Sequence, residues 1–274
     1  MPLVLTPLSH GPAAPLSVDL RGIVPERVAG LGPTDVAMLP VAADGRPCPL
    51  GDLFAVTGDT TDATIECRGD FARVHFVAAG IGSGVMRVTG HVGRHAGQGM
   101  SGGRLEVQGD AGDWLAAHIE GGHVVVAGNA GHNLAAALPG APFGGRGGVV
   151  LVGGSAGDLA AARLRRGVVA VAGNCGAGAA FEMRAGTLVV TGHLGTQPGL
   201  GMRRGSLLAL TSHPHLPTTF RRGTTWRPTF LPLFFRWLRE SGFGPAEAAL
   251  AVPAWRQWHG DALTGGRGEL LHPA

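Results

Sequence analysis

Glycine recurs in this chain at three fixed phases of a 19-residue period. Gly90, Gly109 and Gly128 set the first phase, which resumes after one step of 26 residues at Gly154, Gly173 and Gly192. A second glycine follows three residues later, and a third stands near the end of each repeat (Gly93, Gly112, Gly131, Gly157, Gly176, Gly195; Gly103, Gly122, Gly148, Gly167, Gly186, Gly205). Self-similarity at a fixed period of this length is the signature of a stacked repeat fold.

Apolar residues recur in the same frame. One stands ten residues after each first glycine (Met100, Ile119, Leu138, Leu164, Met183, Met202), and alternate residues are apolar after the third (Leu105/Val107, Val124/Val126, Val150/Val152, Val169/Val171, Leu188/Val190, Leu207/Ala209). Strict alternation predicts a short half-buried strand. His, Asp, Asn or Ser follows each first glycine, as turns favour. The predicted fold is all-β: a single-stranded β-helix, or β-solenoid, of 19-residue coils. A hexapeptide repeat is absent, which excludes the left-handed β-helix of acyltransferases.

The repeat divides the chain into three segments. Residues 61–210 are the predicted β-helix, with weaker first coils around Ile81–Val88 and Ile65–Cys67, because terminal repeats are atypical. The long step is a 7-residue insertion confined to Pro139–Gly147. Residues 1–60 are an irregular lead-in, with apolar alternation over Leu16–Leu20 and a short helical stretch over Pro25–Leu31. Residues 211–274 form a separate, mostly irregular and helical tail.

Composition excludes several functions. All 22 basic residues are Arg, so chemistry based on a lysine of this chain, including a Schiff base or a Walker A loop, is excluded. Residues 1–210 hold 15 Arg and 15 acidic residues, so the net charge of +3 lies in the tail, which argues against nucleic-acid binding. No apolar run predicts a membrane span, and neither the start of the chain nor its three cysteines indicates secretion. We therefore expect a cytoplasmic protein.

The tail differs in kind from the repeats. It carries four of five Trp (Trp226, Trp237, Trp255, Trp258) and five of ten Phe (Phe220, Phe230, Phe234, Phe235, Phe243). Pro232 and Gly242 bracket a predicted helix, and a second short helix is predicted over Pro245–Ala251. Aromatic residues together with Arg are typical of interface cores. The tail is predicted either to cap the open end of the stack or to dock a partner, and one tail can do both.

No catalytic or metal-binding residue is assigned. His91 and His95, and His213 and His215, have the spacing of metal-ligand pairs but lack an accompanying Cys, Asp or Glu. The segment Val149–Leu164 imitates a dinucleotide fold, yet the repeat already explains its glycines Gly153, Gly154 and Gly157. Cys175 lies in a repeat turn and is expected to be a small buried residue. Asp110 and Asp113 are a carboxylate pair for which turn hydrogen bonding is a sufficient role.

The repeat resembles a known family. Coils such as GHVGRHAGQGMSGGRLEV (Gly90–Val107) and GNCGAGAAFEMRAGTLVV (Gly173–Val190) are similar to the glycine-rich β-helix shared by the C-terminal domain of glutamate synthase large chains and the C subunit of formylmethanofuran dehydrogenase. The resemblance covers roughly Gly51–Leu210 and includes GDLFAVTGD (Gly51–Asp59). The tail segment RQWHGDALTGGRGELL (Arg256–Leu271) is most similar to the C subunit of the bacterial formyltransferase/hydrolase complex.

That resemblance implies a non-catalytic scaffold subunit in one-carbon metabolism and formaldehyde oxidation, as in methylotrophy. Its implied partners are an amidohydrolase-like, a dehydrogenase-like and a formyltransferase subunit. Together they move formyl groups from a tetrahydromethanopterin-type carrier to a methanofuran-type carrier and release formate; the carriers and a metal are expected on the partner subunits and no cofactor on this chain. Two alternatives are the C subunit of a tungsten or molybdenum formylmethanofuran dehydrogenase, and a module in which Arg221, Arg222 and Arg227 hold the polyglutamate chain of the carrier.

Overall fold

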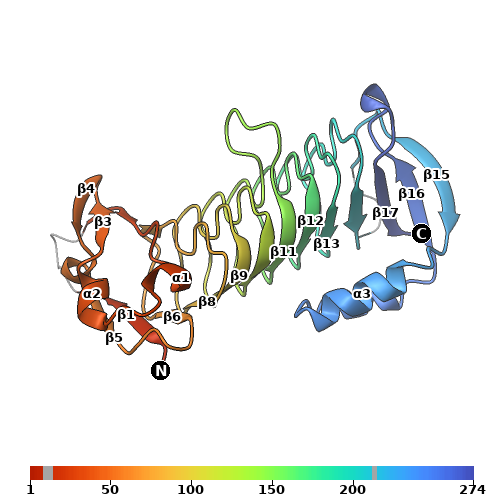
Figure 1. Cartoon of the computed structure of the whole chain (residues 1–274). Coiled ribbons are helices and arrows are strands. Elements are labelled where there is room, and N and C mark those ends of the chain that lie inside the picture. Colours follow the sequence, from red (N-terminus) through yellow and green to blue (C-terminus); the bar gives the residue numbers. More distant parts are fainter. Residues whose placement is uncertain (9–14, 212–214) are drawn as a thin grey trace.

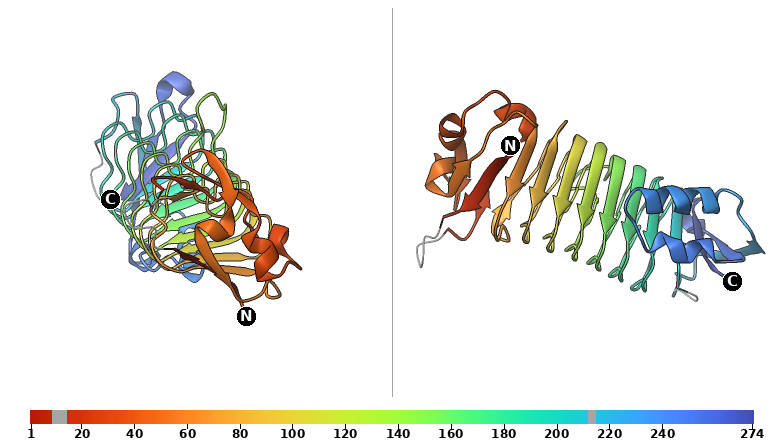
Figure 2. Two further views of the ribbon diagram at one scale, coloured as in Figure 1. Left: turned by 90° about the vertical axis from the view of Figure 1, so that its left-hand side faces the viewer. Right: turned by 90° about the horizontal axis from the view of Figure 1, so that it is seen from below.

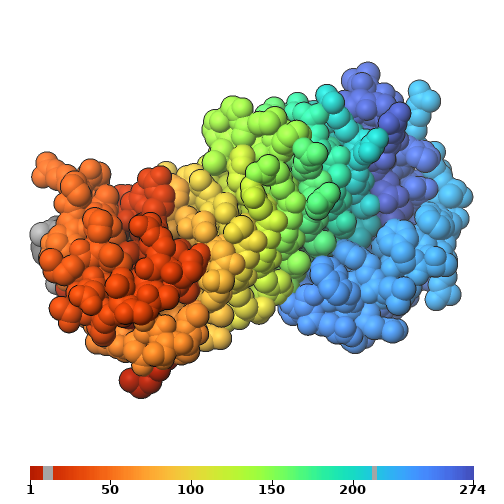
Figure 3. Space-filling view, viewed as in Figure 1, coloured from red at the N-terminus to blue at the C-terminus, as the bar shows by residue number. Residues whose placement is uncertain are grey.

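One sheet of 13 strands runs from end to end of an elongated molecule (Figures 1 and 3). The structure is a computed structural model that describes residues 1–8, 15–211 and 215–274. Strands far outnumber helices in it, which confirms the expected all-β class. The three-segment division of the chain stays a prediction, and the sheet draws strands from all three segments.

The middle of the sheet consists of eight parallel strands in chain order. They are β6 (Thr64–Cys67), β8 (Val85–Val88), β9 (Ser101–Val107), β10 (Gly121–Val126), β11 (Arg146–Val152), β12 (Arg166–Val171), β13 (Thr187–Val190) and β14 (Ser206–Ala209). From β8 to β14, each pairs with its neighbour at the 19-residue offset, or 26 across the insertion (Val126 opposite Val152). A second column of parallel bridges links the turns, running from Phe71 and Val92 through to Cys175 and Leu194.

The alternating apolar residues point into the body of the molecule, as predicted. All twelve of those named above are at most 2% exposed, and so are Met100, Ile119, Leu164, Met183 and Met202. Leu138 differs because the insertion follows it, and its side chain is only partly buried. Gly145 of the insertion lies between Ile119 and Leu164, and a Cβ there would stand 3.0 and 2.9 Å from their side chains. A glycine of the insertion thus lies between the core side chains of the two flanking repeats.

The three glycine phases have two physical causes. A Cβ on Gly128 would lie 2.7 Å from the Gly109 carbonyl oxygen and would also collide with the Asp110 carboxylate. The first glycine is therefore required by the close approach of the preceding repeat. The third glycine instead opens the strand in the left-handed region, as at Gly122 with φ of 85°.

Between the second glycine and the strand, alternate residues take left-handed backbone conformations even where they are not glycine. In one repeat these are Trp114, Ala116 and His118, with φ of 63°, 53° and 56°. Their N–H groups donate alternately to the next and the previous repeat, for example Trp114 N to His132 O at 2.8 Å and Ala116 N to Ala96 O at 2.7 Å. The backbone of each repeat is thus satisfied by both neighbours.

The first 60 residues were expected to be an irregular lead-in, but their strands extend the large sheet and form most of a second one. Strand β1 (Leu3–Pro7) pairs parallel with β6, and β5 (Phe54–Thr57) pairs antiparallel with β1, so both extend the large sheet. A second sheet combines β2 (Val18–Asp19), β3 (Pro40–Ala43), β4 (Arg46–Pro49) and β7 (Val74–His75). Short helices α1 (Pro25–Val28) and α2 (Pro33–Ala37) and the 3-10 turn η2 (Leu50–Asp52) lie beside them. The expected helical stretch over Pro25–Leu31 is thus confirmed as one turn.

The prediction of a mostly irregular and helical tail is wrong in one respect, because the tail also supplies strands that extend the sheet before its helices cover part of it. Strand β17 (Glu269–Pro273) pairs parallel with β14, and β16 (Trp255–His259) and β15 (Arg221–Trp226) follow antiparallel, with the 3-10 turn η3 (Ala262–Thr264) between β16 and β17. Helices α3 (Leu231–Glu240) and α4 (Ala246–Leu250) confirm the two predicted helices. They fold back beneath the outer face of the late strands (Figure 2).

Candidate functional site

The polar residues of the repeat turns form a ladder of hydrogen bonds between repeats. His91 Nδ1 accepts from the Asp110 N–H at 3.1 Å, and Asp110 Oδ1 accepts from the Asn129 N–H at 2.7 Å. Asn129, Ser155 and Asn174 continue the pattern to His193. A parallel ladder passes through Asp113, His132 and Asp158. Each side chain satisfies a backbone donor of the next repeat, so the turn role expected for Asp110 and Asp113 matches the geometry.

The two histidine pairs with metal-ligand spacing, to which no metal was assigned, have different surroundings. His91 belongs to the ladder, whereas the His95 ring is stacked between Phe76 (4.6 Å) and Trp114 (6.1 Å) in a separate row. Burial lowers the pKa of His95, which favours its neutral ring. His213 lies outside the described residues, so its pairing with His215 is not described. Among residues 1–8, 15–211 and 215–274, no group of three or more His, Cys, Asp or Glu side chains could hold a metal ion.

Cys175 and the nucleotide-like segment are part of the repeat architecture. Cys175 is 3% exposed, and burial raises the pKa of its thiol to about 12, so the thiolate is disfavoured. In Val149–Leu164 the strand β11 is followed by a turn and not by a helix. The helix N-terminus that a dinucleotide site needs is therefore replaced by the next repeat turn.

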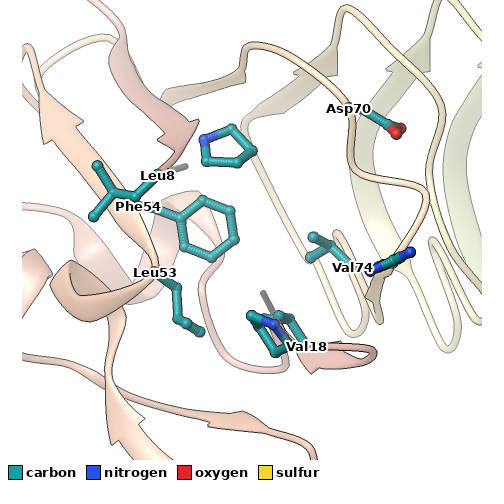
Figure 4. A pocket seen from close by; sticks show the side chains of 9 residues that line it. Leu8, Val18, Leu53, Phe54, Asp70 and Val74 are labelled. Carbon is teal, nitrogen blue, oxygen red and sulfur yellow. The ribbon is translucent and has the colours of Figure 1, made fainter. Parts of the chain in front are cut away.

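Among the hollows near the N-terminal end of the stack, a cavity and a groove are lined in part by the first repeat turns. Figure 4 shows a small cavity of about 150 Å³, with Val18, Leu53 and Phe54 on its apolar wall and Asp70 at its edge. An open groove of about 470 Å³ runs beside it along the first repeat turns and is lined by His75, His91, Asp110 and Asp113. Ladder hydrogen bonds already engage these four side chains. The groove is therefore lined by structural polar groups.

The aromatic residues of the tail fall into two sets. Phe235, Phe243 and Trp255 are at most 3% exposed and pack on the outer face of the sheet, where Phe235 and Trp255 stack at 5.7 Å. Phe220 is buried against the end of the main core. The second set stays exposed and includes one aliphatic residue: Phe230 at 47%, Trp237 at 41%, Trp226 at 39% and the aliphatic Leu233 at 68%. The tail thus caps the stack and still presents an apolar surface.

The exposed set gathers on the solvent side of α3 and at the end of β15. Phe230, Leu233 and Trp237 follow the spacing of one helix face, and Phe234 contacts Trp237 at 5.9 Å between ring centroids. We call Trp226, Phe230, Leu233 and Trp237 the α3 face. A contiguous apolar surface with aromatic residues is typical of a protein interface.

The basic residues of the tail lie beside this surface. Arg221 and Arg222 are exposed on β15, the last strand of the sheet, and Arg227 follows it. None of the three forms an ion pair with the described part of the chain. An edge strand with free backbone groups can also pair with a partner. The predicted contact of these arginines with a polyglutamate chain stays a prediction.

The chain is similar to known proteins over its whole length. No family model matches the sequence. An 80-residue segment is 38% identical to the C subunit of the formyltransferase/hydrolase complex Fhc of Methylorubrum extorquens strain AM1; it spans 29% of this chain and only 30% of that protein. The fold superposes with a TM-score of 0.91 on a chain of the X-ray crystal structure of the formyltransferase/hydrolase complex (FhcABCD) from Methylorubrum extorquens in complex with methylofuran, at 37% identity and covering 99% of both chains.

The chain belongs to the C-subunit family of the formyltransferase/hydrolase complex. The resemblance stated from the repeat and the tail is thereby confirmed, and it extends beyond Gly51–Leu210 to the full chain. Between the two kinds of complex considered, the comparisons favour the formyltransferase/hydrolase complex over the tungsten or molybdenum dehydrogenase.

Sequence reasoning missed the pattern that shows which part of the sheet the tail helices cover. The residue between the two buried positions of each strand points outward, and along the sheet it reads Arg87, Glu106, Val125, Leu151, Ala170, Val189, Leu208 and Leu271. The last five of these are at most 2% exposed because α3 and α4 cover them. Continuous apolar runs such as VVLV and TLVV predict strands buried on both faces. They could have located the covered face in advance.

Proposed function

We propose that this chain is the non-catalytic scaffold subunit of a complex that transfers formyl groups from a tetrahydromethanopterin-type carrier to a methanofuran-type carrier and releases formate. One observation carries the proposal: at 37% identity, 99% of the chain superposes on 99% of a chain of the formyltransferase/hydrolase complex FhcABCD. A match that includes both ends supports the same place in an assembly, since the tail that would meet a partner is part of it.

The scaffold would be a single-stranded β-helix of 19-residue coils. Two parallel columns support this class, the strands of the large sheet and the turn bridges from Phe71 to Leu194. Each repeat supplies one strand and one bridge at the same register. Such a stack is stiff along its axis because every repeat bonds to two neighbours.

A scaffold role accounts for how the polar turn residues are used. The carboxylates, amides and imidazoles of the turns accept hydrogen bonds from backbone N–H groups of the next repeat. As the family resemblance implies, catalysis, the carriers and a metal would belong to amidohydrolase-like, dehydrogenase-like and formyltransferase partners in the cytoplasm. FhcABCD was solved with methylofuran, which supports a carrier of that type in the assembly.

We infer that the α3 face is a docking surface for one of these partners. Its side chains are 39–68% exposed, while neighbouring residues of the same helix are fully buried on the sheet. The buried side fixes α3 in place, so the exposed side is presented rigidly. Preorganised apolar and aromatic side chains are efficient interface anchors.

Assembly tests this docking role. The chain is co-expressed with the other subunits of its complex and captured through a tag. The double variant Leu233→Glu/Trp237→Glu should reduce recovery of partners about tenfold or more, because charge is placed at an apolar interface. The matched control Leu263→Glu changes an apolar side chain that is 82% exposed on η3 and should assemble normally. Circular dichroism checks that both variants fold. Normal assembly of the double variant would exclude the α3 face as a docking surface.

Activity tests the non-catalytic role separately. The purified chain should give no formyl transfer and no formate release with either carrier, and adding it to the remaining subunits should restore the turnover of the complex. Turnover by the isolated chain would overturn the scaffold proposal.

A further inference from the structure

Arginines line the corner of the stack at which the late strands begin. Successive repeats align Arg165, Arg184 and Arg203. Their backbone N–H groups donate at 2.8–2.9 Å to the backbone carbonyls of the preceding repeats (Gly145, Leu164 and Met183). Arg166 and Arg204 stand one residue further along. Arg267 stands two residues before Glu269, as Arg204 stands two before its pairing partner Ser206. We call these six residues the arginine ridge.

The ridge brings arginines of adjacent repeats to one corner without a compensating acid. Neighbouring repeats are about 4.8 Å apart along the hydrogen bonds, and like charges held on adjacent repeats are destabilising. Within residues 1–8, 15–211 and 215–274, none of the six forms an ion pair. The nearby acids are otherwise engaged: Glu182 pairs with Arg163, Glu120 with Arg146, and Glu269 accepts from Ser206 and Gln257.

Two further observations show that the ridge is held in place and not fully satisfied. The Arg165 guanidinium lies over the Phe143 ring at 4.6 Å, and Arg163 donates to the Ala141 carbonyl, so the insertion Pro139–Gly147 packs against the start of the ridge. Figure 1 shows this loop projecting between β10 and β11, with η3 at the other end of the same edge. In the middle, Arg184 Nε is buried and has no hydrogen-bond partner.

We propose that the arginine ridge binds an extended acidic segment of a partner subunit. This inference rests on the proposed function, because it supplies a second contact for the assembled scaffold. A row of guanidinium groups suits carboxylates, which they bind in bidentate fashion. Nucleic-acid sites of this kind add aromatic stacking platforms, whereas the ring beside the ridge, Phe143, is already covered by Arg165. Residues 1–210 are neutral overall, with 15 Arg and 15 acidic residues, so this corner concentrates positive charge locally and not through an overall excess.

Direct binding to the isolated full chain tests the ridge. The probe is a fluorescent oligoglutamate peptide of about six residues. It spans about 20 Å when extended, which is long enough to cover the ridge from Arg165 to Arg267. The triple variant Arg166→Gln/Arg203→Gln/Arg204→Gln should weaken binding about tenfold, and the affinity of the native chain should fall between about 50 and about 200 mM salt. The matched control, Arg221→Gln/Arg222→Gln/Arg227→Gln, removes the same number of exposed charges from the tail and should bind as the native chain does.

Each other outcome counts against the ridge. An equal loss of peptide affinity in both triple variants would mean non-specific charge attraction. A loss of affinity in the tail variant alone would mean that the peptide binds at β15. Tighter binding of an oligothymidylate of the same charge would make the ridge a nucleic-acid site. The α3-face variant Leu233→Glu/Trp237→Glu should retain peptide binding, and a loss there would mean that the peptide binds at the α3 face instead. A chain that assembles normally but does not bind the peptide overturns this inference and leaves the proposed function standing.

Discussion

The outer face of the sheet changes character halfway along the stack, although the inner face does not. In the early repeats it carries Arg87 and Glu106, which form an ion pair at 2.9 Å and remain partly exposed. In the late repeats the same position is apolar and buried under α3 and α4 (Leu151, Ala170, Val189, Leu208). The repeat thus dictates the core and leaves the outside free to vary. The polarity of that outside position determines where the tail can pack.

The largest expected effect comes from removing an anchor of the covered half. Phe235→Ala should lower the free energy of unfolding by about 3–5 kcal/mol, because a fully buried ring that packs α3 on the sheet and stacks on Trp255 is lost. Arg87→Ala in the uncovered half should cost at most about 1 kcal/mol, as for exposed ion pairs. Guanidinium unfolding curves measure both. Similar losses would mean that the two halves do not differ as described.

A smaller effect should be the same in both halves. Gly128→Ala and Gly192→Ala each place a Cβ within 3.0 Å of the preceding repeat's backbone and turn side chain, so each should cost about 1–3 kcal/mol. Gly244→Ala is the control, since nothing lies within 4 Å of its Cβ position. Thermal unfolding compares the three variants. A tolerated change at either repeat glycine would contradict the close-approach explanation.

Acidification should weaken the early half by a smaller and more gradual amount. Burial is the main cause that lowers the pKa of His75, His95, His118 and His123, all within the early repeats. The folded state therefore prefers neutral rings, and the unfolded chain binds more protons below the usual pKa of about 6.5. The stability that these rings contribute is present above that pH and is lost as pH falls through the lowered pKa values. Hydrogen exchange at about pH 7.5 and about pH 5 should lose protection in β8–β10 before β12–β14. Uniform loss would contradict this.

Much of the fold is predictable from the sequence because the repeat is strict. The glycine phases and the alternation located strands β9 to β14, and Pro232 and Gly242 bounded the longer of the two tail helices. The family resemblance was also accessible from the repeat and the tail. The sequence did not show which apolar residues of the tail are buried and which are exposed. Phe235 and Leu233 are both apolar residues of the same helix and differ in which side of α3 they occupy.

The candidate site residues were likewise predictable only in part. Residues whose side chains could act in catalysis or metal binding, such as His91 and Asp110, could be judged structural because other repeats place Asn or Ser at the same position. The arginine ridge could not be recognised without the exact register, since Arg204 and Arg267 are far apart in the chain and come together only when β17 joins β14. Contacts between distant segments are set by packing, and local pattern does not encode them.

The left-handed residues in the turns have a consequence for how the molecule folds. Such a conformation costs a non-glycine residue about 1–2 kcal/mol, and a repeat such as the one holding Trp114, Ala116 and His118 adopts it three times. The N–H groups of these three residues all donate to adjacent repeats, and these bonds help to offset the cost. A single repeat is therefore unstable by itself, and a repeat that docks on a formed neighbour finds its partners in place. Folding of the stack should therefore be strongly cooperative, with a nucleus of a few repeats onto which further repeats add one by one.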